Sequence, residues 1–155
     1  KQYDSIVSIE MFEAVGRKYW NRYFSTLKHS LSEKGKAVIQ TITIDDDVYE
    51  GYKNRSDFIQ KHIFPGGMLP SHKVFNELAT KFGFNISNHY SFGSCYAKTL
   101  SKWLDSFEQA KDKVKSLGFD EEFTRKWSFY LSYCIAGFAN QRTDVVQYTL
   151  EHKPY

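Results

Sequence analysis

Ser5-Ile6-Val7-Ser8-Ile9 is a short run rich in β-branched residues, and it predicts a buried strand near the start of the chain. The segment from Arg17 to Leu31 has apolar residues at helical spacing, and Lys34-Gly35 is a typical helix end. A second strand is predicted from Lys36 to Ile44. A strand, a helix and a strand at this spacing form one βαβ crossover, so the two strands are expected to pair in parallel.

The rest of the chain adds helices and two more strands. Helical spacing of apolar residues predicts helices at Tyr52–Ile63, Ser71–Phe82, Tyr96–Val114 and Asp120–Phe138, and strands are predicted at Phe84–Phe92 and Thr143–Leu150. Asp45-Asp46-Asp47 is interpreted as a solvated break, and prolines and glycines exclude regular structure from Phe64 to Pro70. This order predicts an α/β fold, the second half of a doubly wound sheet with inserted helices.

The first two predicted strands end in polar residues. In doubly wound sheets, ligands bind beyond the carboxyl ends of the parallel strands. Those ends carry Glu10-Met11-Phe12-Glu13 and Gln40-Thr41-Ile42. Two carboxylates at such a place could act as acid or base, or hold a polar ligand, although glutamates at a strand-to-helix turn are more often solvated or capping.

The composition indicates which classes of partner, such as nucleic acid, membrane or metal, the protein could bind. The net charge of +3, from 21 basic and 18 acidic residues, is too small to argue for nucleic-acid binding, and it is compatible with contact to an anionic membrane. No apolar stretch is long enough for a bilayer-spanning helix. The two cysteines, Cys95 and Cys134, and the five histidines have no metal-binding spacing, so no metal site is predicted. Both thiols are expected to be buried in a protein of a reducing compartment.

The aromatic share is high, at 17% of residues. One interpretation is a pocket lined with rings, whose faces would stabilise a cation. The other is an aromatic-rich core, which explains most rings in most proteins. Tyr23, Phe24, Tyr90 and Trp103 are candidates for the pocket, with a core role favoured for each.

Four longer motifs, in order along the chain, resemble the signature of the cyclopropane-fatty-acyl-phospholipid synthase family. They are Ser8-Ile9-Glu10-Met11-Phe12-Glu13-Ala14-Val15-Gly16, Gln40-Thr41-Ile42, Ile63-Phe64-Pro65-Gly66-Gly67-Met68-Leu69-Pro70-Ser71 and Phe92-Gly93-Ser94-Cys95-Tyr96. The resemblance covers nearly the whole chain. It implies the carboxyl-terminal half of a class I S-adenosylmethionine-dependent methyltransferase, with its Rossmann-like fold, and residues 1–155 would then be a partial methyltransferase domain.

The resemblance also implies a reaction. Members transfer the methyl group of S-adenosylmethionine to the cis double bond of unsaturated phospholipid acyl chains, and a cyclopropane ring closes after a bound bicarbonate accepts a proton. The positions that match the family's bicarbonate site are Glu13, Gln40, Ile42 and Tyr96, of which Glu13 and Tyr96 would be catalytic. Gln40 stands where the family has a histidine, and its amide can donate a similar hydrogen bond but cannot take up a proton.

The family's glycine-rich cofactor loop has no counterpart in the chain. None of the nine glycines forms a G-x-G loop after a strand, so the residues that bind the cofactor are expected before Lys1, and residues 1–155 alone are expected to be inactive.

The first strand would then be an open sheet edge, for which pairing into a homodimer is expected. The expected location is the cytoplasm, with peripheral contact to the membrane. The alternative from another class is a non-catalytic module that binds acyl chains or acts as a scaffold.

Overall fold

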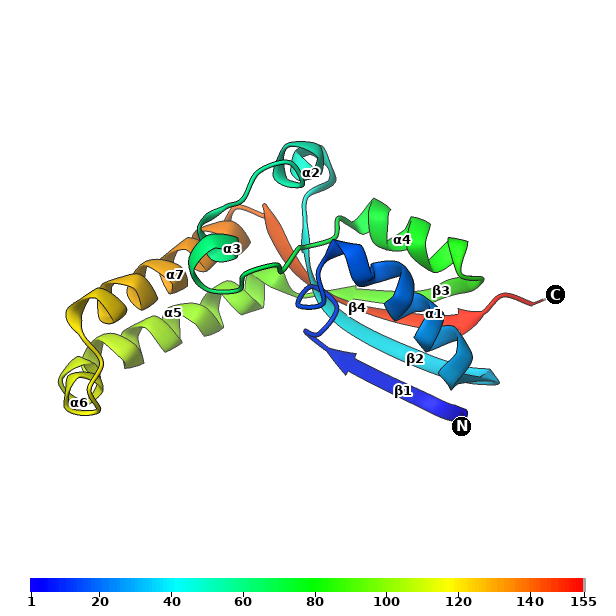
Figure 1. Cartoon of the computed structure of the whole chain (residues 1–155), viewed down its shortest axis with the longest axis horizontal. Helices are drawn as coiled ribbons and strands as arrows, with labels where there is room; N and C mark the ends of the chain where they lie inside the picture. Colours follow the sequence, from blue (N-terminus) through cyan, green and yellow to red (C-terminus); the bar gives the residue numbers. More distant parts are fainter. Residues whose placement is uncertain (155) are drawn as a thin grey trace. The chain divides into compact units, whose positions relative to one another are not determined.

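Four strands form one sheet in the order β1-β2-β4-β3 in the computed structural model, which describes residues 1–154 (Figure 1). They are β1 (Tyr3–Ile9), β2 (Leu31–Ile44), β3 (Phe84–Ser91) and β4 (Thr143–His152). β1 pairs with β2 in parallel, from Tyr3 beside Leu31 to Ile9 beside Gln40, which confirms the predicted crossover. β3 pairs with β4 in antiparallel orientation.

The chain divides into two compact units, which we describe separately. The first comprises Lys1–Ser91 and the residues from Asp144 onward, and the second is Phe92–Thr143. The helices of the first unit are the short 3-10 helix η1 (Arg17–Tyr19) with α1 (Trp20–Ser30), α2 (Asp46–Tyr52), α3 (Phe58–His62) and α4 (His72–Lys81). Those of the second unit are α5 (Gly93–Gln109), α6 (Lys111–Ser116) and α7 (Glu121–Ala139).

The aromatic residues of the first unit form the core between the sheet and helices α1 and α4. The Phe24 ring lies 5.6 Å from the Phe12 ring and 5.4 Å from the Phe75 ring, centroid to centroid. Phe75 stacks on Tyr148 of β4 at 4.1 Å. All four side chains are fully buried. Because Phe12 belongs to the segment after β1, this packing fixes the part of the chain that carries Glu13.

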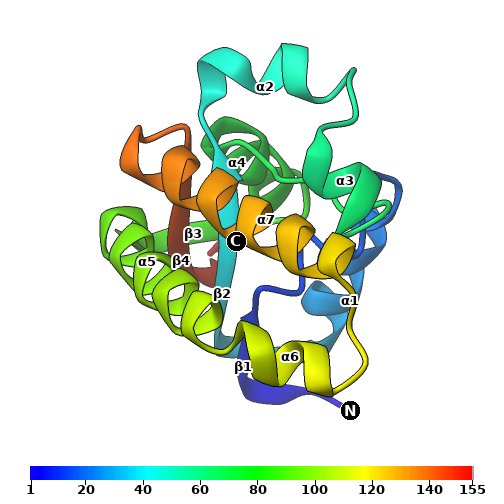
Figure 2. The same ribbon diagram turned by 90° about the vertical axis from the view of Figure 1, so that its left-hand side faces the viewer.

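In the second unit, α5 and α7 lie side by side and α6 connects them (Figure 2). Asp120 caps α7 as predicted, because its side chain accepts a hydrogen bond of 2.7 Å from the Phe123 amide. Gly118, which lies between α6 and α7, has a positive φ of 94°, a conformation that glycine adopts at little cost. The predicted helix from Tyr96 to Val114 is divided at Ala110, between α5 and α6.

Three local predictions were wrong. α1 ends at Ser30 and β2 begins at Leu31, so Lys34-Gly35 lies inside a strand, and the extended backbone of the buried Leu31 explains the early end. Asp45 starts a helix, because its side chain accepts a hydrogen bond from the Asp47 amide and caps α2. Cys95, expected to be buried, is exposed.

The burial of β1 also differs from the prediction. Val7 is 67% exposed and Ile9 64% exposed. Ile6, next to Val7, packs against the core, so Val7 and Ile9 lie on the opposite face of the edge strand β1. A β-branched run shows that a segment is suited to a strand, but it does not show what covers the strand. The predicted open edge is therefore present in the described residues.

Candidate active site

The segment after β1 is a tight turn. Its first residue, Glu10, donates its amide to the Gln40 carbonyl oxygen at 2.8 Å and has a positive φ of 51°. The amide of Ala14 then donates to the Met11 carbonyl at 3.1 Å. With Phe12 buried in the core, this turn places the Glu13 side chain beside β2.

The Glu13 carboxylate is held by two donors on β2. The Thr41 hydroxyl donates to Oε2 at 2.7 Å, and the Ile42 main-chain amide donates to Oε1 at 3.3 Å. Burial raises the pKa of Glu13, although these hydrogen bonds lower it in part. A carboxyl group that is partly buried and less acidic than usual, at a strand end, suits the binding or transfer of a proton.

Gln40 lies next to this pair but turns to other partners. Its amide nitrogen donates to Glu10 Oε1 at 2.9 Å, and its oxygen accepts from Gln147 Nε2 at 2.9 Å. The two strand ends that we singled out are therefore joined by side-chain hydrogen bonds. β2 continues past this point to Ile44, so Gln40-Thr41-Ile42 lies within the strand, level with the end of β1.

Tyr96 belongs to the second unit, on α5. There its ring packs against Phe138 at 5.1 Å and Trp103 at 6.3 Å. The structure thus brings Glu13 and Ile42 together with Gln40 beside them, and it describes Tyr96 within the other unit.

The sequence analysis assigned no hydrogen-bonding role to three polar groups near Glu13. Thr41, fully buried, was quoted only as part of a motif, and its position between Gln40 and Ile42 is the signal that could have identified it. Ser8 Oγ and the Tyr23 hydroxyl are buried and have no hydrogen-bond partner within the described residues 1–154. Burial raises the pKa of Tyr23, which the Ser8 hydroxyl partly lowers and the Glu13 charge raises further.

These groups suit a small anion that carries a proton. Glu13 can accept a hydrogen bond from such an ion, and the two buried hydroxyls can donate to it, whereas the single Ile42 amide hydrogen is directed at Glu13 and can only be shared. No group of three or more His, Cys, Asp or Glu side chains within residues 1–154 could hold a metal ion.

The irregular segment from Phe64 to Pro70 supports Glu13 from outside the sheet. The Met68 amide donates to the Glu13 carbonyl oxygen at 2.9 Å. Gln60 of α3 donates to the Gly67 carbonyl at 3.0 Å, and the Leu69 amide donates to the Tyr52 hydroxyl at 3.2 Å. This motif therefore positions the candidate site rather than merely connecting two helices.

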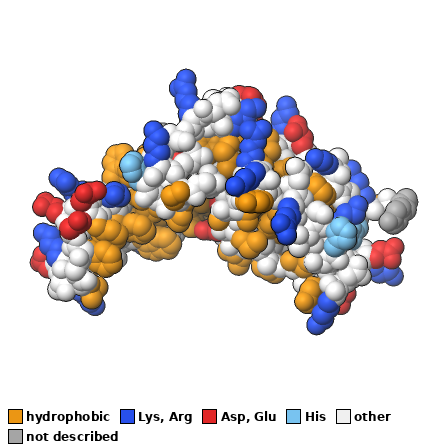
Figure 3. Space-filling model, in the orientation of Figure 1, with side chains coloured by type: hydrophobic (Ala, Val, Ile, Leu, Met, Phe, Trp, Pro, Cys, Tyr) orange, Lys and Arg blue, Asp and Glu red, His pale blue; other side chains and the backbone are white. Residues whose placement is uncertain are grey.

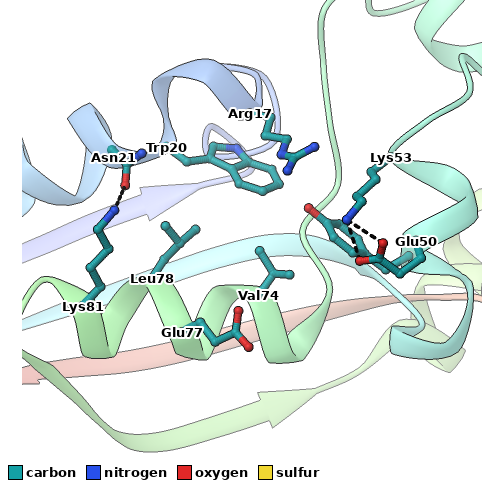
Figure 4. A pocket seen from close by; sticks show the side chains of 10 residues that line it. Arg17, Trp20, Asn21, Glu50, Lys53, Val74, Glu77, Leu78 and Lys81 are labelled. Atoms are coloured by element: carbon teal, nitrogen blue, oxygen red, sulfur yellow. Dashed lines mark hydrogen bonds and ion pairs between the residues drawn. The ribbon is translucent and has the colours of Figure 1, made fainter.

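A separate groove of about 390 Å³ lies among the helices of the first unit (Figure 4). Its lining includes Arg17 and Trp20 from the start of the first helical segment, and Lys53 with Glu50 from the end of α2. Lys53 is paired with Glu50 at 2.6 Å. Because the groove's lining shares no residue with the Glu13 cluster, we assign it no part in the chemistry.

The four candidate rings have different surroundings. Phe24 is a core residue, as favoured, whereas Tyr90 is 60% exposed and Trp103 is 52% exposed. Tyr23, near Glu13, is the one of the four whose hydroxyl lies in the cluster.

The raised pKa of Glu13 predicts a pH-dependent cost to folding. As pH rises, the unfolded protein loses this proton at a lower pH than the folded protein does. The protonated Glu13 side chain therefore contributes to the stability of the folded state at low pH, and this contribution is lost as pH rises through the folded-state pKa. Glu13→Gln does not titrate. We therefore expect its unfolding midpoint, relative to wild type, to be higher at about pH 7 than at about pH 4. Thermal unfolding at both pH values measures this, and a difference that is constant or reversed contradicts it.

Comparisons with known proteins give a consistent result. The family model described as mycolic acid cyclopropane synthetase matches residues 1–148. The chain is 42% identical over 150 residues to tuberculostearic acid methyltransferase UfaA1 of Mycobacterium tuberculosis, covering 96% of this chain and 35% of that protein. It is 32% identical over 138 residues to cyclopropane-fatty-acyl-phospholipid synthase of Escherichia coli, covering 88% of this chain and 34% of that protein.

Solved structures agree. Cyclopropane synthase MmaA2 from Mycobacterium tuberculosis matches 97% of this chain with a TM-score of 0.87 and 28% identity. Mycolic acid cyclopropane synthase CmaA1, solved in complex with SAH and CTAB, also matches 97% with a TM-score of 0.88 and 31% identity. The chain covers 55% of each of these chains and about a third of the two relatives above. The fold is the Rossmann-like methyltransferase fold, in part.

Proposed function

The chain belongs to the mycolic acid cyclopropane synthetase family, and on this premise we propose that it is part of an enzyme that methylates the cis double bond of unsaturated phospholipid acyl chains and closes a cyclopropane ring. The observation that carries the proposal is the Glu13 carboxylate, which is partly buried and hydrogen-bonded to Thr41 and Ile42 where β1 ends. The family match favours this enzyme role over a non-catalytic acyl-binding or scaffold module.

S-adenosylmethionine would supply the methyl group, and bicarbonate would accept the proton lost before ring closure. In this proposal Glu13 accepts the hydrogen bond of the anion's hydroxyl and so directs its other oxygens toward the substrate. The Ile42 amide is shared between Glu13 and the anion, and Gln40 offers the amide hydrogen that does not contact Glu10. Because a glutamine amide does not take up a proton, Gln40 serves as a donor only, and proton acceptance falls to the anion.

The cofactor is proposed to be held by protein outside these 155 residues. None of the chain's nine glycines forms a G-x-G loop after a strand. Turnover requires cofactor, anion and lipid to be positioned together, so we expect the 155 residues alone to show none.

A second candidate is methyl transfer without ring closure. The relative with 42% identity is named a methyltransferase rather than a cyclopropane synthase. Both candidates use the same site and differ in the fate of the carbocation after methyl transfer.

One assay tests the proposal and separates the two products. A complete enzyme that contains this chain is incubated with S-adenosylmethionine labelled on its methyl group and with vesicles of a cis-unsaturated phospholipid. The expected product is a labelled fatty acid with a cyclopropane ring, identified by gas chromatography and mass spectrometry. A methylated product without a ring that keeps a double bond, formed when the carbocation loses a proton, favours the second candidate. Absence of label from the lipid, or equal labelling of a fully saturated phospholipid, contradicts both.

A further inference from the structure

One hydrogen bond joins the start of α4 to β4, an inner strand of the sheet. The Tyr148 hydroxyl of β4 lies 2.7 Å from Nδ1 of His72, which is the first residue of α4. Tyr148 is fully buried, and burial raises the pKa of its hydroxyl, which therefore keeps its proton. Because this hydroxyl contacts no other acceptor within residues 1–154, it donates to His72 Nδ1, and the imidazole that accepts is neutral.

The surroundings of His72 oppose a positive charge on its ring. His72 is half-buried, and the His89 ring of β3 lies edge-on to it at 5.3 Å, centroid to centroid. A charge in the first turn of α4 would also meet the positive end of the helix dipole. Burial and His89 lower the pKa of His72, although Asp46 of α2 and Asp144 of β4 raise it in part. The next residue, Lys73, is exposed, and Figure 3 shows further Lys and Arg side chains on the face formed by α1, α2 and α4.

The first turn of α4 is also a point where several elements meet. The Lys73 amide donates to Asp46 Oδ1 at 3.0 Å, which ties α4 to the start of α2. The Ile44 amide, at the end of β2, donates to the Pro70 carbonyl oxygen at 2.9 Å. We call the segment from Pro70 to Lys73 the α4 junction. The bond between α4 and β4 therefore helps to hold together parts of two strands and two helices.

We propose that the hydrogen bond between His72 and Tyr148 is an acid-sensitive latch, which holds the α4 junction on the sheet while His72 is neutral and releases it when His72 takes up a proton. A protonated Nδ1 carries a hydrogen and no longer accepts. The Tyr148 hydroxyl would then have to accept, and its own hydrogen would be buried without an acceptor. An unsatisfied buried donor is unfavourable, so the closed state is disfavoured.

The pH range of the latch follows from the direction of the pKa shift. The folded-state pKa of His72 lies below the ordinary histidine value of 6.5, so the open state takes up the proton first as pH falls. The contribution of the latch to stability is therefore fully present above about pH 6.5 and is lost as pH falls through the folded-state pKa. This direction is opposite to that of Glu13, whose protonated form favours the folded state at low pH.

Release of the α4 junction would reach the candidate site. Pro70 ends the irregular segment in which the Met68 amide donates to the Glu13 carbonyl oxygen at 2.9 Å. Loss of the latch therefore loosens the support of Glu13, and the enzyme would be less active in acid. This consequence for activity rests on the proposed function, whereas the latch itself does not depend on it.

Hydrogen–deuterium exchange of the complete protein that contains this chain measures the latch directly. Peptides that cover the first two turns of α4 are followed from about pH 7.5 to about pH 5, and their rates are corrected for the intrinsic pH dependence of exchange. We expect the opening of this segment to increase about fivefold over that range, the usual effect of losing one hydrogen bond. Tyr148→Phe, which lacks the donor, should show the increased opening already at the upper end of the range.

Two further substitutions separate the titration of His72 from its structural role. His72→Asn keeps an acceptor oxygen for the Tyr148 hydroxyl but does not titrate, so the increase in acid should disappear. His89→Gln removes a neighbour that lowers the pKa of His72, so the increase should move to higher pH. The matched control is His29→Asn, which changes an exposed histidine of α1 and should leave exchange in α4 unchanged.

Three results would overturn the latch. The first is an opening of α4 in the wild type that is the same at both ends of the pH range. The second is an increase that persists in His72→Asn, because another group would then be the one that titrates. The third is an equal change in the His29→Asn control. Exchange is measured without turnover, so its outcome is independent of the methyltransferase assay.

Discussion

Glu13→Gln lowers the turnover of the complete enzyme by about a hundredfold or more, the expected size for removing a group that handles a proton in the transition state. The substituted amide has one oxygen, which can accept from Thr41 or from Ile42, whereas the carboxylate accepts from both through its two oxygens, at 2.7 Å and 3.3 Å. It loses the negative charge and the second acceptor oxygen. In the proposed mechanism the anion's hydroxyl then lacks a strong acceptor, so the ion is held more weakly and in more than one orientation.

The control for this variant is Glu33→Gln, the same substitution at an exposed position of β2. It should leave turnover within about threefold of wild type, because surface substitutions away from a site have small effects. Turnover is measured with saturating lipid and cofactor, alongside thermal unfolding to show that both variants are folded. If Glu13→Gln is folded and retains wild-type turnover, Glu13 has no catalytic role and the assignment of this cluster is wrong.

Periodicity and turn residues were enough to predict most of the elements. The parallel pairing of β1 and β2 followed from two β-branched runs separated by one amphipathic helix. The helix predicted from Ser71 is also present as α4, and the Ser71 hydroxyl caps it by accepting a hydrogen bond of 3.3 Å from the Val74 amide. Local patterns failed where tertiary contacts decide. Lys34-Gly35 has the composition of a helix end, yet the burial of Leu31 ends the helix earlier. Asp45 was interpreted as part of a solvated break between elements, whereas its carboxylate caps α2 in the structure.

The candidate site was predictable only in part, for a physical reason. Motif resemblance located Glu13 and Ile42, which do lie together. Ser8 and Tyr23 come from β1 and α1, and nothing in the spacing of one strand and one helix shows that two hydroxyls will be buried near the same carboxylate. Gln40 was expected to point at the anion, but its amide contacts Glu10, an interaction across two strand ends that periodicity does not predict.

Gly16→Ala is expected to lower the free energy of unfolding by about 3 kcal/mol or more, the largest stability effect that we predict for a single methyl group. Gly16 has φ 76° and ψ 152°, a backbone conformation that residues with a side chain rarely adopt. Its added carbon would lie 2.5 Å from the Gly66 carbonyl oxygen, which belongs to the backbone and cannot rotate away. Relief therefore requires the two turns to separate, and chemical denaturation measures the cost.

Separation of these turns should also reduce turnover, which distinguishes Gly16 from an ordinary structural glycine. The Met68 amide, two residues after Gly66, donates to the Glu13 carbonyl at 2.9 Å, so a displaced segment would release the residue that carries the carboxylate. Gly51→Ala is the matched control: it adds the same methyl group in α2, where no atom lies within 4 Å, and should be neutral or stabilising by up to about 1 kcal/mol. If Gly16→Ala is as stable as Gly51→Ala, the contact between the two turns does not hold Glu13 in place.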